Sequence, residues 1–137
     1  MNNKLEYIPG DLVMVDNDIV KVMARSVNYF LKIINNYDVM FHSGNVYKYI
    51  PNKLKPIPLT PEILEKNGWY GATHIKQSDD NTKILYKTFK RKGYPTIKVS
   101  QELKITCELS PFIVKLESVP DLQHLLFGLG LNSEMEV

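Results

Sequence analysis

The segment KPIPLTPEILEKNGW, residues 55–69, carries the strongest start and stop signals in the chain. Its first two prolines cannot donate to a β-ladder, so a strand that precedes them must end there. Thr60 is a favourable N-cap, and Pro61 suits the first helical position, where its missing N–H costs nothing. Gly68 suits the left-handed residue that follows a helix. The segment therefore predicts a short helix between Pro61 and Gly68 that separates two groups of strands.

Residues 1–55 alternate short apolar runs with turn residues at intervals of about eight to ten positions, a spacing typical of small all-β units. The turn signals include DND at 16–18 and a break at NNYD, residues 35–38. Closing the sheet would protect edges that a five-stranded open sheet leaves exposed. We therefore expect residues 1–55 to form a small SH3-like β-barrel. Its predicted strands are residues 10–15, 19–27, 29–34, 39–43 and 46–50.

Residues 56–137 are predicted to form the short helix after Thr60, about five further strands and a last helix. Ser118 followed by Asp121 predicts a capping box for a helix that begins near Pro120. The apolar stripe expected on that helix is Leu122, Leu125, Leu126 and Leu129. The predicted class is thus α+β: a barrel, then an antiparallel sheet flanked by two short helices. The strands expected in this second module are residues 73–77, 82–90, 96–100, 103–109 and 112–118.

The joint between the two modules contains little glycine or serine, so we expect them to pack as one unit. The 137 residues suit one domain or two small modules, and 44% apolar with 23% charged residues is ordinary for a globular core. No apolar run is long enough for a membrane span or a signal peptide. The single cysteine cannot form an internal disulfide. These features indicate a cytoplasmic protein without a membrane partner.

Two segments carry a family resemblance. Residues 56–68 match the pattern P-I-P-L-T-x-E-x-L-x-x-x-G-F, with Trp69 in place of the phenylalanine, and residues 122–129 match L-Q-x-L-x-F-x-L. These segments, about a fifth of the chain, resemble short uncharacterised proteins encoded in prophages and mobile elements of gut anaerobes. The resemblance implies a mobile-element origin and a non-enzymatic accessory role. It assigns no role to His124, which stands outside the matching positions.

The chain lacks the local signatures of catalytic and metal sites. His42, His74 and His124 lie on separate predicted elements, and together with Cys107 they have no metal-ligand spacing. The glycines do not cluster into a phosphate-binding loop. We therefore expect no catalytic residues, no metal and no cofactor. A hydrolase site assembled from distant residues is the alternative that this pattern leaves open.

Charge is distributed unevenly although the net charge is only +2. Residues 83–98 contain six basic and no acidic residues, and residues 117–137 contain four acidic and no basic ones. A hairpin over 83–98 would place basic side chains at its turn beside a tyrosine, and phosphates and unpaired bases bind such groups. The candidate nucleic-acid-binding residues are Lys87, Lys90, Arg91, Lys92 and Tyr94.

Two other interpretations of this basic segment remain open. Its lysines could form a solvated tip that protects the sheet from edge-to-edge association, or they could dock an acidic partner such as the C-terminal region. The favoured hypothesis is a non-enzymatic binding or adaptor module with an unassigned partner. Nucleic-acid binding through residues 83–98 is its alternative.

Overall fold

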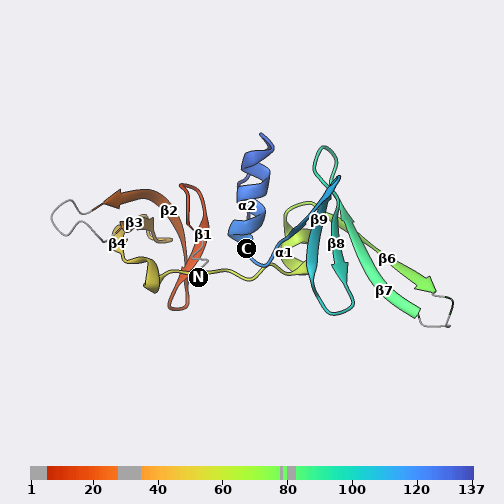
Figure 1. The fold of residues 1–137 in the computed structure, drawn as a ribbon. Coiled ribbons are helices and arrows are strands. Elements are labelled where there is room, and N and C mark those ends of the chain that lie inside the picture. Colours follow the sequence, from red (N-terminus) through yellow and green to blue (C-terminus); the bar gives the residue numbers. More distant parts are fainter. Residues whose placement is uncertain (1–5, 28–34, 78, 80–82) are drawn as a thin grey trace. The chain divides into compact units, whose positions relative to one another are not determined.

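The computed structural model describes residues 6–27, 35–77, 79 and 83–137. It contains two antiparallel five-stranded sheets and two short helices, which confirms the α+β class (Figure 1). Two compact units comprise residues 1–57 with 118–134, and residues 58–117 with 135–137. The boundary near 57 lies close to the predicted junction after residue 55, whereas helix α2 (Val119–Gly128) groups with the first sheet. Neither described helix has the length of apolar chain that a bilayer crossing requires.

The first sheet has the strand order β4-β3-β2-β1-β5. The β1–β2 hairpin turns at the predicted DND segment, where Asp16 adopts a φ of 53°. Within the described residues no ladder joins β4 to β5, so the predicted barrel closure is not confirmed. The elements are β1 (Leu12–Val15), β2 (Asp18–Val27), β3 (Asn35–Met40), β4 (Val46–Tyr49), the 3₁₀ helix η1 (Pro51–Lys53) and β5 (Lys55–Pro56).

Strand β3 differs from the sequence-based prediction. The strand expected at 29–34 lies outside the described residues, and NNYD, expected as a break, begins β3 instead. Within β3, Tyr37 and Val39 are 3% and 0% exposed, so alternate side chains enter the core. The Tyr37 hydroxyl accepts a hydrogen bond from the Tyr7 N–H at 3.3 Å. Packing therefore outweighs the weak strand propensity of asparagine and aspartate.

Most buried residues of the first unit come from helix α2 and from its sheet. Helix α2 begins after the predicted capping box, in which Ser118 Oγ accepts from the Asp121 N–H and Asp121 Oδ2 accepts from the Ser118 N–H. Leu122 and Leu126 are fully buried, but Leu129 follows the helix and is 44% exposed, so the predicted stripe is shorter than expected. The core cluster comprises Tyr7, Val13, Val15, Val20, Val22, Tyr37, Val39 and Leu54.

The second unit begins with the predicted helix, α1 (Pro61–Lys66). Thr60 caps it by accepting from the Ile63 N–H at 3.3 Å, and Gly68 follows it with a φ of 90°. A five-stranded antiparallel meander then follows with the order β10-β9-β8-β7-β6. Its strands are β6 (Tyr70–Gln77), β7 (Lys83–Lys90), β8 (Ile97–Ser100), β9 (Ile105–Leu109) and β10 (Phe112–Lys115).

Candidate nucleic-acid interface

The register of the second sheet assigns every strand residue to one of two faces. Phe89 pairs with Ile97, which pairs with Cys107, and all three are fully buried. Thr88, one position away, pairs with Lys98. Directly paired residues share a face, and neighbours along a strand alternate between faces. The sheet therefore has an inner face that contributes to the core and an outer face that is largely exposed.

The outer face concentrates lysine and aromatic side chains. It carries four lysines from four strands against a single glutamate, Glu108. The face extends across all five strands, and one continuous row runs Ala72, Thr88, Lys98, Thr106 and Lys115. Its residues are Tyr70, Ala72, His74, Lys76, Ile84, Tyr86, Thr88, Lys90, Lys98, Ser100, Thr106, Glu108, Ile113 and Lys115.

Tyr86 on the central part of β7 anchors a stack on this outer face. The His74 ring stacks on it with centroids 5.1 Å apart and an interplanar angle of 23°. Lys98 Nζ lies 4.6 Å from the Tyr86 centroid, a cation–π distance. Thr88 Oγ1 lies 2.8 Å from His74 Nε2, which fixes the imidazole orientation. Three strands thus hold a ring stack with a cation beside it.

A second aromatic ring lies near the edge of the outer face. Tyr70 is 80% exposed and pairs with Lys90 across the β6–β7 ladder. Lys98 and Lys115 are two strands apart in the same row, which corresponds to about 10 Å at normal strand spacing. The arrangement presents separated positive charges around exposed rings. Such a surface can hold phosphates and stack unpaired bases.

The residues predicted from sequence do not all lie on this face. Lys90 lies on the outer face, and Lys92 is exposed in the turn between β7 and β8. Lys87 pairs with Thr73 and Val99, so it lies on the inner-face side. The prediction missed His74, Tyr86, Lys98 and Lys115, because only the strand register brings them together.

Arg91 and Tyr94 serve the packing of the turn. The Arg91 guanidinium lies 3.9 Å from the Tyr94 ring centroid and 5.0 Å from the Trp69 centroid. Trp69 is 1% exposed, contacts Tyr94 edge-on at 5.4 Å, and donates from Nε1 to the Pro95 carbonyl. This cluster fixes the turn against the residue that precedes β6. Arg91 therefore contributes charge from a fixed position.

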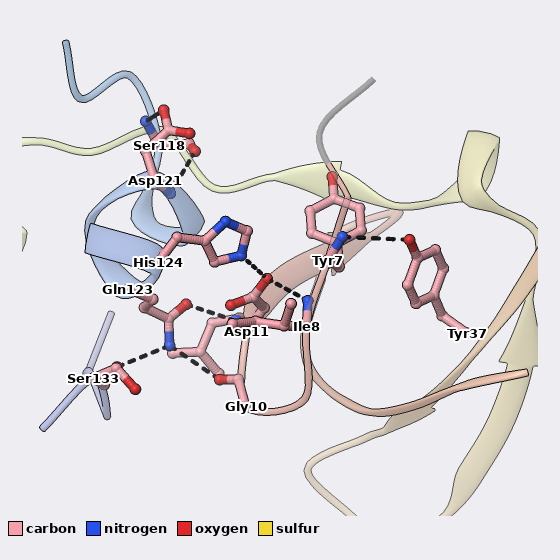
Figure 2. A network of polar contacts seen from close by, with 11 residues as sticks. Tyr7, Ile8, Gly10, Asp11, Tyr37, Ser118, Asp121, Gln123, His124 and Ser133 are labelled. Atoms are coloured by element: carbon pink, nitrogen blue, oxygen red, sulfur yellow. Dashed lines mark hydrogen bonds and ion pairs between the residues drawn. The ribbon is translucent and has the colours of Figure 1, made fainter. Parts of the chain in front are cut away.

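The first unit contains a separate buried polar network (Figure 2). Asp11 is 1% exposed, and its Oδ2 accepts from the Ile8 N–H at 2.9 Å and lies 2.6 Å from His124 Nε2. Burial raises the pKa of the Asp11 carboxyl above its usual range, and the Ile8 and His124 contacts oppose that rise. Burial, followed by the charges of Tyr37, Asp11 and Asp121, raises the pKa of the Tyr7 hydroxyl to about 12.

Gln123 completes this network one residue before His124. Its Oε1 accepts from the Leu12 N–H at 2.9 Å, and its Nε2 donates to the carbonyls of Gly10 and Ser133 at 3.0 and 3.1 Å (Figure 2). The side chain is 2% exposed. These bonds tie helix α2 to the segment that enters β1.

Metal binding and thiol chemistry are two further kinds of chemistry that side chains of this composition could provide. In the part of the chain that the structure describes, no group of three or more His, Cys, Asp or Glu side chains could hold a metal ion. Cys107 is fully buried in β9, and burial, followed by the Glu108 charge, raises the pKa of its thiol. A buried thiol with a raised pKa is a poor nucleophile at neutral pH.

No protein-family model, curated protein or solved structure matches this chain.

Proposed function

We propose that this protein is a non-enzymatic binding module that holds single-stranded nucleic acid on the outer face of its second sheet. The observation that carries the proposal is the stack of His74 and Tyr86 with Lys98 over it, in a face where lysines outnumber acids four to one. Exposed sheet faces with aromatic rings suit unpaired bases, because every base has a face that can stack. The resemblance to prophage and mobile-element proteins fits an accessory role of this kind.

The geometry favours a single strand over a duplex. The His74–Tyr86 stack and the lysine row lie on the face of the sheet, whereas direct reading of duplex bases relies on an element that enters the major groove. Base stacking on the exposed Tyr70 and His74 side chains needs bases that are not already stacked on both sides. Lysines on four strands can meanwhile contact successive phosphates along the strand.

Fluorescence anisotropy with labelled single- and double-stranded DNA and RNA, at low and physiological salt, tests the proposal. We expect single strands to bind more tightly, with an affinity that falls as salt rises. Replacing Lys90, Lys98 and Lys115 by alanine should reduce the slope of log affinity against log salt by about 2, at about 0.7 per lost phosphate contact. Tyr70→Ala should weaken binding by about 1–3 kcal/mol.

The chain provides a matched control on the opposite face. Lys83 and Lys87 lie on the same strand as Lys90 but alternate to the inner-face side. Their double alanine variant should bind as the parent does if the outer face is the site. The same loss per lysine removed in both variants would indicate a nonspecific charge effect, and absence of binding at low salt would contradict the proposal.

A second candidate function is supported by the first unit. The order β4-β3-β2-β1-β5, with η1 between β4 and β5, supports an SH3-like fold for it. A cleft of about 420 Å³ lies between the β1–β2 and β3–β4 turns and includes Phe41, whose ring meets Tyr47 edge-on at 5.5 Å. Aromatic grooves on such folds can hold proline-rich peptides. NMR titration with proline-rich peptides should shift the Phe41 and Tyr47 signals if this unit is an adaptor; unchanged signals would exclude this cleft.

A further inference from the structure

Strand β6 is the longest edge strand in the two sheets. It spans eight residues, Tyr70–Gln77, and all eight are exposed. It pairs with β7 on one side and ends the strand order of its sheet (Figure 1). The other described edges are protected: β10 and β4 have four residues and include Lys115 and Lys48, and β5 has two residues, one of them Pro56. Natural edge strands are usually kept short, charged or interrupted by proline, because their free backbone groups pair with other strands.

Strand β6 has little of this protection. It contains no proline, its ladder with β7 has no register shift, and Lys76 is its only residue with a full charge. Ile75 is 66% exposed, and Tyr70 is 80% exposed. An unprotected edge of this length fits a partner that supplies a complementary strand.

We propose that the partner is a second copy of this chain, which pairs β6 with β6 in antiparallel orientation about Thr73. In this register Tyr70 lies opposite Lys76 of the other copy, Gly71 opposite Ile75, and Ala72 opposite His74. The symmetry axis passes between the two Thr73 residues, and a threonine pair is favourable at opposed positions. No two like charges meet, and each exposed tyrosine gains a lysine as a neighbour.

Self-complementarity is what favours a second copy over an unrelated peptide. A two-fold interface needs one surface that matches itself, and an antiparallel strand pair about Thr73 meets that requirement. Because directly opposed residues share a face, the outer faces of both copies lie on the same side of the joined sheet. The dimer would therefore present one ten-stranded face. This inference stands whether or not nucleic acid is the ligand.

Sedimentation equilibrium of the full chain, at concentrations up to about 100 μM, tests for the dimer; a micromolar complex is populated there. Thr73→Glu should abolish it, since two carboxylates would meet at the axis. In the monomer the new carboxylate faces Lys87 across the ladder, so the fold should be retained. Ile113→Lys is the control, because it adds a charge at an exposed position on the opposite edge strand, β10, and should leave the dimer intact. The new lysine would face Glu108, so the fold should be retained as well.

Cysteine cross-linking tests the register. Opposed residues in an antiparallel pair have Cα atoms about 4.5–5.5 Å apart, which a disulfide can span. Thr73→Cys should therefore form a disulfide-linked dimer under mild oxidation, and His74→Cys should not. A chain that stays monomeric, a Thr73→Glu variant that still dimerises, or cross-linking through His74→Cys alone would each overturn the proposal.

Discussion

Replacing Gln123 by methionine should destabilise the first unit by about 3 kcal/mol. Methionine has a similar length and can neither donate nor accept as the amide does. The Gln123 side chain is 2% exposed, and its amide accepts from the Leu12 N–H and donates to the Gly10 and Ser133 carbonyls. The change removes all three hydrogen bonds. A typical hydrogen bond contributes about 1 kcal/mol net, and groups that remain buried without a partner cost at least as much.

Urea unfolding followed by far-ultraviolet circular dichroism measures this loss. With an m-value of about 2 kcal/mol/M, the midpoint should fall by about 1.5 M. Amide exchange gives a local test: the Leu12 N–H should exchange faster, whereas the Val22 N–H, bonded to the Asp11 carbonyl at 2.8 Å, should keep more of its protection. Gln101→Met, the same change at an exposed site, is the control. A loss under about 1 kcal/mol with a protected Leu12 amide would refute the reasoning.

Three further predictions concern packing and ionisation. Gly71→Ala should cost about 1–3 kcal/mol, measured as a lower melting temperature, because its Cβ would lie 2.8 Å from Cε1 of the buried Phe89 ring. Asp11→Asn should remove one source of pH dependence in the free energy of unfolding. Burial raises the native pKa of the Asp11 carboxyl, so the stability that its protonated form contributes is present at low pH and is lost as pH rises through that pKa. The parent's stability relative to this variant should therefore fall from acid to neutral pH in urea titrations, and a difference that rises would contradict the assignment. Arg91→Ala should lower stability by about 1 kcal/mol and shift the Trp69 emission, because the stacked guanidinium is lost; an unchanged spectrum would argue against the contact.

Local chemistry explains which elements were predictable. The helix after Thr60 and the helix after Ser118 depend on caps and first-turn residues that lie within a few positions of each other. The first four residues of β3 differ from the predicted break because their strand conformation depends on the packing of Tyr37 and Val39 against other strands. Strand count and edge protection predict a closed barrel, but neither specifies which strands pair, and the described first sheet has two distinct ends, β4 and β5.

The candidate sites depended on information that is not local. The basic composition of residues 83–98 points to the segment that contains β7 and β8, but the pairing of Thr88 with Lys98 is set by the geometry of the intervening turn. Without that register, Lys87 could not be assigned to the other face. The Asp11–His124 contact joins residues 113 positions apart, and no spacing rule connects them.

The division of the chain into units has a consequence for its biosynthesis. Residues 58–117 stand between the first sheet and α2 in the sequence, although α2 groups with that sheet. As the chain leaves the ribosome, the contiguous second sheet can form while the first still lacks its helix. The hydrogen bond between Leu12 and Gln123 joins residues 111 positions apart. It must form late, because closing a long loop costs more entropy than closing a short one. A ribosome-bound chain from which residues 58–117 have emerged, while α2 is still inside the exit tunnel, should therefore hold a formed second sheet and an unprotected Leu12 amide.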